Sequence, residues 1–471
     1  MHFRARILGA AALLACAPLH AADIRPDLAI EDVSIIDVEN DRTLRHRTIL
    51  VSQGRITAIA ATGRIAIPAT ATRIDGRDRF LVPGLIDVHV HLFNNPSGRP
   101  PNDWALPLFV AHGVTGVREM SARPANVPVL AQWARDADAG TRVAPRVLGV
   151  AMAIGGEAPA AQVDAAAAAG ATAIKLFSEF PDAQLATTLA AARAHRLPVV
   201  GHAPPARPLL DTAPDLGTNE HLMQAYEACS PVGNDILAER RAAPPASVGD
   251  VLAAQEPRVL AAFDARACRR AARALARLQA RQVPTLVLDA SPRDGRHATH
   301  PLWPLVRVDE QARWERNLAP FTDADRTLER QRGTVARRIV REFHAAGVPI
   351  LAGTDAPMPE VYPGLSLHDE LALLVQAGLP PRAALRAATI AAAGALDRAA
   401  DHGFIAVGKR ADLVLLDADP TRDIAHTRRI RGVVLDGRWL DRAALDRLLG
   451  SPTTSASTSC SSPSSPCRSG R

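Results

Sequence analysis

The amino-acid sequence predicts an α/β protein: a (β/α)8 (TIM) barrel with a small β-sandwich domain built from both chain ends. Eight short apolar runs recur along the middle of the chain, and Ala-rich stretches with strong helix propensity separate several of them. Strands that alternate with helices form parallel sheets, and eight such units suit a closed barrel. Apolar, β-branched runs near both ends of the chain predict the second domain.

The β-sandwich is expected from five runs that polar turns separate. Three of these runs lie in the N-terminal part of the chain and two near the other end: Leu28–Asp37, Thr48–Val51, Arg55–Ala60, Asp412–Asp417 and Arg431–Leu440. We therefore place the two parts of this domain at residues 23–81 and 403–448.

The barrel is predicted to occupy residues 82–402. Its expected strands are Leu85–Val90, Val114–Arg118, Val147–Ile154, Thr172–Phe177, Leu197–Val200, Thr218–Leu222, Val283–Leu288 and Val348–Ala352. The stretches 160–169 and 183–195 are rich in Ala, the best helix former, and are predicted to be helices. The longest insertion, residues 223–282, is expected to be mostly helical. An open, doubly wound sheet is the competing fold, but no G-x-G-x-x-G motif opens a helix in this sequence.

Both termini are expected to lie outside the folded domains. Residues 1–22 show the basic, apolar and small-residue regions of an export signal, which predicts an exported, periplasmic protein. The run Leu13–Cys16 resembles a lipobox, so a lipid anchor at Cys16 is the alternative. Residues 449–471 are rich in Ser and Pro and are predicted to be disordered. No run reaches the roughly 18 uncharged apolar residues that a membrane helix needs, so no transmembrane span is expected.

Charge and cysteine content restrict the partners of the protein. The chain has 55 basic and 49 acidic residues among 471, and no block of five Lys or Arg, so no nucleic-acid partner is expected. A small-molecule substrate is expected instead, and a homo-oligomer stays open. Cys229 and Cys268 lie in the same insertion and form either a disulfide or two separate buried thiols.

Histidines follow the first predicted barrel strand. His89 and His91 are two residues apart, and side chains alternate along a strand, so both imidazoles face the same side. At the carboxyl end of a barrel strand that side faces the mouth, where active sites lie. Two imidazoles at this spacing can share a metal ion.

Four further polar residues lie on other predicted strands or at their ends. Lys175 interrupts an apolar strand, although only two of the 55 basic residues are lysines. A buried ammonium is costly to desolvate, but an amine, unlike a guanidinium, can react with carbon dioxide to form an anionic carbamate. His202, His221 and Asp355 each follow a strand-like run, and a closed barrel brings such ends together. We call His89, His91, Lys175, His202, His221 and Asp355 the six predicted ligands.

The motifs around these residues resemble those of the amidohydrolase superfamily, in its imidazolonepropionase-like or prolidase-like branch. The matching segments follow in order as PGLIDVHVH, GVTGVRE, IKLF, VVGHA, EHL, AGTDA, SLHDELALLVQAGL and GKRADLVLLD. The resemblance implies two divalent metal ions, with zinc expected because its usual ligands are imidazole and carboxylate. His89, His91 and Asp355 would hold one ion, His202 and His221 the other, and a carboxylated Lys175 would bridge them.

The resemblance also implies hydrolysis of an amide or peptide-like bond in a small substrate, a dipeptide or an N-acyl amino acid. Hydroxide formed between the metal ions would attack the carbonyl, and Asp355 would act as general acid and base. A cyclic amide or imidazolone ring is the alternative substrate. A metal-binding protein without catalysis is the alternative from a different functional class. A deaminase with a single metal ion fits the sequence less well, because such a site does not need Lys175.

The substrate contacts are less specified by the sequence. Tyr226 and Tyr362 follow ligand-bearing strands, and a phenol can donate a hydrogen bond to a developing oxyanion. We take Tyr226 as the second predicted catalytic residue; ordinary packing in a loop is the alternative for both tyrosines. Arg118 and His368 lie in the matching motifs, with a structural ion pair and a helix-surface histidine as their alternatives.

Overall fold

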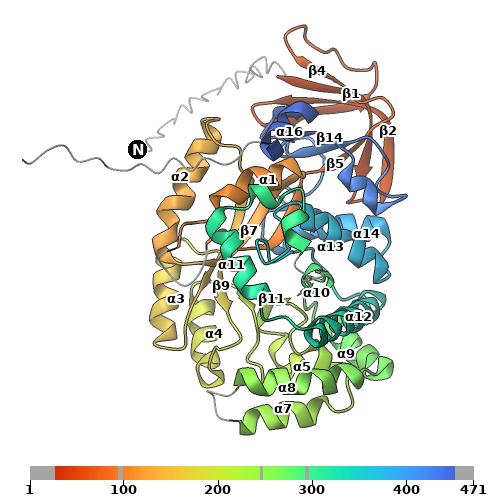
Figure 1. The fold of residues 1–471 in the computed structure, drawn as a ribbon. Helices are drawn as coiled ribbons and strands as arrows, with labels where there is room; N and C mark the ends of the chain where they lie inside the picture. Colours follow the sequence, from red (N-terminus) through yellow and green to blue (C-terminus); the bar gives the residue numbers. More distant parts are fainter. Residues whose placement is uncertain (1–26, 94–98, 244–247, 292–295, 451–471) are drawn as a thin grey trace, which may run out of the picture.

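The computed structural model describes residues 27–93, 99–243, 248–291 and 296–450 (Figure 1). The predicted export signal, Cys16 and residues 451–471 of the predicted tail lie outside these ranges. The described chain forms a barrel of parallel strands and a separate mixed sheet, as predicted. None of the helices in these ranges is both long and apolar enough to cross a membrane.

Seven parallel strands form the barrel sheet, and their order in space is their order in the chain. They are β6 (Leu85–Val90), β7 (Val114–Ala122), β8 (Arg146–Ala153), β9 (Ala173–Leu176), β10 (Val199–Gly201), β11 (Leu216–Glu220) and β12 (Gln282–Val283). The seventh predicted strand is therefore wrong beyond Val283, where Pro284 follows and a short helix begins at Val287. Proline has no N–H to donate to the ladder, and Thr285 has a left-handed φ of 49°, so the strand ends there.

The eighth predicted strand, Val348–Ala352, closes the barrel without forming a regular ladder. Single bridges pair Gln282 with Ile350 and Val90 with Ala356. The Leu351 N–H donates to the Gln282 carbonyl at 2.9 Å, and the Val88 N–H donates to the Ala352 carbonyl at 3.1 Å.

A side chain interrupts this last ladder. The Thr354 N–H donates to Asp87 Oδ1 at 3.1 Å, and the Thr354 hydroxyl donates to Asp87 Oδ2 at 2.6 Å. The backbone donor of Thr354 is thus used by a carboxylate of β6 and not by a neighbouring strand. The next residue, Asp355, has φ 68°, which turns the chain out of the extended conformation at the barrel mouth.

The mixed sheet combines strands from both chain ends in the order β15-β14-β13-β5-β1-β2-β3, with β4 paired to β1. These strands are β1 (Leu28–Asp37), β2 (Arg42–Ser52), β3 (Arg55–Ala61), β4 (Thr72–Asp75), β5 (Phe80–Pro83), β13 (Leu413–Leu416), β14 (Ile430–Leu435) and β15 (Arg438–Asp441). Antiparallel pairing of β5 with β13 joins the two ends. The predicted strand 431–440 is in fact a hairpin, which turns at Asp436 and Gly437, both with positive φ.

Helices cover the barrel and form the insertion. Those that follow the barrel strands are α1 (Leu106–Ala111), α2 (Val127–Asp138), α3 (Pro159–Ala168), α4 (Leu185–Ala194), α5 (Leu209–Thr212), α12 (Asp323–Ala345), α13 (Leu365–Gln376), α14 (Pro381–Ala387) and α15 (Ile390–Ala395). The remaining helices are α6 (Ala225–Ala228), α7 (Gly233–Ala242), α8 (Val248–Ala261), α9 (Ala265–Arg277), α10 (Val287–Ala290), α11 (Val308–Leu318) and α16 (Arg442–Gly450). The predicted Ala-rich helices and the helical insertion are confirmed. Figure 1 shows α7 and α8 at the end of the molecule far from the mixed sheet.

A disulfide joins the two ends of the insertion. Cys229 directly follows α6, and Cys268 lies on α9, 39 residues further along the chain. Both side chains are fully buried. Of the two arrangements that the sequence leaves open, the structure has the bridge.

We expect Cys229→Ala to lower the free energy of unfolding by about 2–4 kcal/mol, because the open chain regains loop entropy. Denaturant titration with and without reductant measures this difference. Cys268→Ala is the matched control and should shift the midpoint equally, while reductant should destabilise only the wild type. A wild type whose midpoint does not respond to reductant would contradict the prediction.

Candidate metal centre

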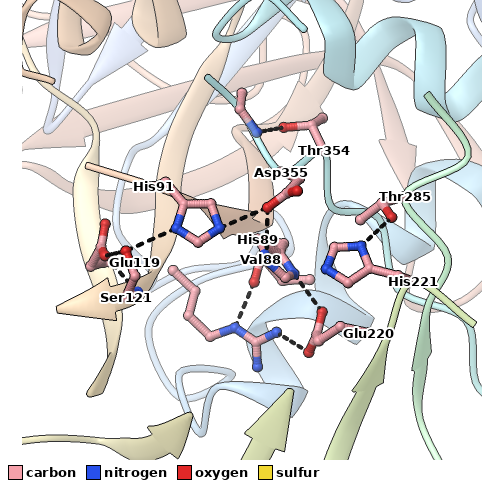
Figure 2. Close-up of polar contacts among 12 residues, drawn as sticks. Val88, His89, His91, Glu119, Ser121, Glu220, His221, Thr285, Thr354 and Asp355 are labelled. Atoms are coloured by element: carbon pink, nitrogen blue, oxygen red, sulfur yellow. Dashed lines mark hydrogen bonds and ion pairs between the residues drawn. The ribbon is translucent and has the colours of Figure 1, made fainter. Parts of the chain in front are cut away.

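The six predicted ligands come together where the barrel strands end. Figure 2 shows four of them, His89, His91, His221 and Asp355, around one point. The Nε2 atoms of His89 and His91 lie 3.1 and 2.7 Å from Asp355 Oδ1. One donor atom each from His89, His221 and Asp355 lies within 4.8 Å of the others, a spacing that suits a metal ion.

The imidazole rings form a continuous group. Ring centroids are 5.4 Å apart for His89 and His91, 4.7 Å for His89 and His221, and 4.9 Å for His202 and His221. His89 is fully buried, whereas the other three rings are half-buried. The four rings are therefore shielded from solvent at His89 and partly accessible to solvent at the barrel mouth.

Lys175 lies inside this group and not in solvent. Its side chain is fully buried, and Nζ lies 5.1 Å from the centroid of the Phe177 ring. A Cβ on Gly201 would lie 2.6 Å from Lys175 Cδ, so only a glycine on the neighbouring strand leaves room for the lysine. Burial lowers the pKa of Lys175 to about 8, although the negative charges of Glu220 and Asp355 oppose this shift.

Four buried polar atoms of the centre lack a hydrogen bond of regular geometry: Lys175 Nζ, His89 Nε2, His202 Nε2 and Asp355 Oδ1. Buried polar atoms almost always have partners, so four such atoms in one place need an explanation. Nitrogen and oxygen donors of this kind fit divalent metal ions of the zinc type.

The charge states of the side chains also suit a metal ion. Burial lowers the pKa of His221 to about 3 and holds the pKa of His202 well below its ordinary value, so both rings are neutral. Burial alone would raise the pKa of Asp355, but His91 and His89 bring it well below its ordinary value. Neutral imidazoles and an anionic carboxylate are the forms that bind metals.

A second layer of side chains orients the histidines, and sequence reasoning did not find it. The Nδ1 atom of every ring has a partner: Ser121 Oγ at 2.8 Å from His91, Ser178 Oγ at 2.7 Å from His202, Thr285 Oγ1 at 2.8 Å from His221, and Glu220 Oε2 at 2.7 Å from His89. These contacts leave each Nε2 free to face the centre. The signals in the sequence were Glu220, in the motif EHL next to His221, and Arg118, in the motif GVTGVRE.

Arg118 belongs to this second layer. Its guanidinium is almost fully buried, and Nη2 donates to Glu220 Oε1 at 2.8 Å. Its Nε donates to the Val88 carbonyl at 2.5 Å, one residue before His89. Of its two sequence-based interpretations, the structural ion pair is the one observed, and the pair lies directly behind a predicted ligand.

The three other candidate residues make their described contacts elsewhere. His368 is buried, not on a helix surface: Nδ1 lies 2.9 Å from Thr427 Oγ1, and Nε2 lies 2.9 Å from the His112 carbonyl oxygen. Tyr362 donates to the His297 carbonyl at 3.3 Å and stacks on another ring, with centroids 3.9 Å apart.

Tyr226 is half-buried on α6. Burial raises the pKa of its phenol well above the ordinary value, and Asp289 and Arg332 are the charged groups that act on it most strongly. These charges come from α10 and α12, and no described hydrogen bond joins Tyr226 to the six predicted ligands. Its catalytic role stays a prediction.

A cavity of about 500 Å³ lies apart from this centre, between α2, β8 and the β14–β15 hairpin. Trp133, Arg146 and Arg438 are among its lining residues, and none of the six predicted ligands is. Its most buried cation, Arg146, is paired with Asp412 and Asp436.

Comparison with known proteins relates the chain to one group of enzymes. Residues 297–440 match the Amidohydrolase family. Adenine deaminase 2 from Bradyrhizobium sp. (strain ORS 278) is 32% identical over 87 residues, which are 16% of this chain and 14% of that protein. The match thus spans about a seventh of the curated relative's length.

Solved structures match over nearly the whole chain. The bottromycin amidohydrolase AH is 26% identical, with a TM-score of 0.66 over 89% of this chain and 88% of that one. A putative prolidase from Bifidobacterium longum is 23% identical, with a TM-score of 0.60 over 91% of this chain and 98% of that one. The second likeness shows the fold alone.

Proposed function

We propose that this chain, which belongs to the amidohydrolase superfamily, is a binuclear metal-dependent hydrolase. It cleaves a carbon–nitrogen bond in a small substrate. One observation carries this proposal: buried nitrogen and oxygen atoms that lack a hydrogen bond of regular geometry gather at the barrel mouth. A site built only for stability would have given these atoms regular hydrogen bonds or replaced them with apolar groups.

We assign His89, His91 and Asp355 to one metal position and His202 and His221 to the other. The distances from Asp355 Oδ1 to the two Nε2 atoms support the first group, and the adjacent rings support the second. His221 also lies close to His89, which supports two adjacent metal positions. When bound, a pair of zinc-type ions would supply Lewis acidity that polarises a carbonyl and lowers the pKa of water.

We assign Lys175 as the bridge, in the form of a carbamate. The neutral amine at Nζ would attack carbon dioxide, form a C–N bond and release one proton. Counted from the ammonium form, two protons leave, and a cation becomes an anion with two oxygens. The Nζ is fully buried and lacks a hydrogen-bond partner among the described residues, which supports this assignment. Guanidinium cannot undergo this reaction, which accounts for a lysine in a chain whose basic residues are almost all arginine.

Asp355 is the proposed general acid and base. Its carboxylate is anionic at neutral pH because His91 and His89 lower its pKa against the effect of burial. The backbone of Asp355 has φ 68°, and its carboxylate lies at the barrel mouth. There it can take a proton from water and return it to the leaving nitrogen. An amide nitrogen leaves poorly without that proton.

A dipeptide or an N-acyl amino acid is the substrate that we propose, outside the cytoplasm. The Cys229–Cys268 bridge supports this compartment, because structural disulfides persist where the environment is oxidising. A screen of dipeptides, N-acyl amino acids and lactams, on protein of measured metal content, tests the proposal. Turnover of linear amides is expected; turnover of lactams alone would favour a cyclic-amide hydrolase, and no turnover of a fully metal-loaded protein would favour a non-catalytic role.

We expect Asp355→Asn to lower kcat/KM by at least about 100-fold on the best substrate of that screen, because the amide cannot relay a proton. Metal analysis should find most of the zinc retained, since the other donors are unchanged. Asp211→Asn, an exposed carboxylate on α5, is the control and should retain wild-type activity. Near-normal turnover by Asp355→Asn would remove Asp355 from the proton transfer.

We expect Lys175→Ala to lose at least one of the two proposed metal ions, because the bridging ligand is gone. Elemental analysis after dialysis against metal-free buffer measures the loss. The chain provides a matched control, Lys409→Ala, since the other lysine donates to the carbonyls of Ala399 and Ala400 at 2.8 and 2.6 Å. Full metal content in Lys175→Ala would refute the bridging role.

A further inference from the structure

The four histidines of the centre are not supported in the same way. A neutral hydroxyl of Ser or Thr contacts Nδ1 of His91, His202 and His221. Among these four rings, only His89 has a carboxylate at Nδ1, with Glu220 Oε2 at 2.7 Å. The two side chains come from β6 and β11, strands that do not pair with each other, and both are fully buried.

Glu220 is fully buried and forms an ion pair with Arg118, whose Nη2 lies 2.8 Å from Oε1. A guanidinium stays charged in proteins, so at this distance it favours the anionic carboxylate. Arg118 Nη2 and the Thr218 hydroxyl both donate to Glu220 Oε1, which leaves Oε2 for His89. An anion fixed in this way can only accept, so His89 Nδ1 carries the proton and Nε2 is the metal-binding atom.

Arg118 fixes His89 from a second direction. Its Nε donates to the Val88 carbonyl, so one guanidinium holds both the backbone before His89 and the carboxylate behind it. Its Nη1 also donates to Thr218 Oγ1 at 3.1 Å. The three strands β6, β7 and β11 are tied together at this point, and His89 has little freedom to rotate.

We propose that Glu220, held by Arg118, is a positioning residue that directs His89 Nε2 into the centre and makes the His89–His91–Asp355 end bind the first metal ion more tightly than the His202–His221 end. The inference rests on the proposed metal centre. A carboxylate behind an imidazole makes the ring a stronger ligand than a hydroxyl does, and loss of such a partner typically costs about 10- to 100-fold in metal affinity.

Zinc binding by the full chain tests this inference. Wild type and Glu220→Gln are equilibrated at graded, buffered free zinc, and bound zinc is measured at each concentration. We expect the tighter of two binding steps to weaken by about 10- to 100-fold in Glu220→Gln, with the weaker step changed less than about threefold. Ser178→Ala is the matched control: it removes the hydroxyl behind His202 and should weaken the second step only.

A spectroscopic readout separates positioning from general damage. With cobalt in place of zinc, the visible spectrum of the first equivalent should change in Glu220→Gln, while the spectrum added by the second equivalent should not. Glu220→Asp should recover part of the affinity, because it restores a carboxylate at a longer distance. If Glu220→Gln does not fold, Arg118→Lys replaces it, and the same step should weaken because a lysine cannot hold both Glu220 and the Val88 carbonyl.

The outcomes distinguish this inference from the proposed function. A wild type that binds two zinc ions, with both steps unchanged in Glu220→Gln and Arg118→Lys, would overturn the positioning role alone. Equal weakening of both steps would also overturn it, since that result indicates general damage. A wild type that binds no zinc would overturn the metal centre and this inference together.

Discussion

The burial of charge at the mouth of the barrel is the constraint on which the rest of the structure depends. Arg118, Lys175, Glu220 and Asp355 are all buried, and each would be costly to remove from water alone. They are tolerated because they compensate one another: Arg118 pairs with Glu220, and the negative charges of Glu220 and Asp355 act on Lys175. Such a group is weak evidence for stability, since apolar residues would serve stability equally well, so its presence indicates a function.

The closure of the barrel is adapted to this centre. A regular eighth strand would have continued past residue 353 in extended conformation, with its backbone donors facing its neighbours. Instead the Asp87 carboxylate takes the donors of Thr354, and Asp355 adopts a left-handed conformation beside His89 and His91. The regular ladder is given up at the position where a carboxylate has to face the mouth, which is typical of functional sites.

The family match and the site geometry rest on largely different residues. The matched segment, 297–440, contains Asp355 but none of the other five predicted ligands. Those five come together only through the strands β6, β9, β10 and β11, which lie before that segment. The metal proposal therefore depends on the geometry of the site and on the chemistry of its donor atoms. The assignment as a hydrolase of carbon–nitrogen bonds rests on the comparisons with known proteins.

By itself the sequence determined the barrel, the mixed sheet from both ends and the residues at the strand ends, because local periodicity and chain order specify where strands begin and end. It did not determine that Glu220 lies behind His89, 131 residues away, that His368 is buried, or that the eighth strand is interrupted by Asp87. Nor did it decide between a disulfide and two thiols at Cys229 and Cys268. Those features depend on which surfaces pack together. Side chains far apart in the sequence interact only after the whole barrel has closed.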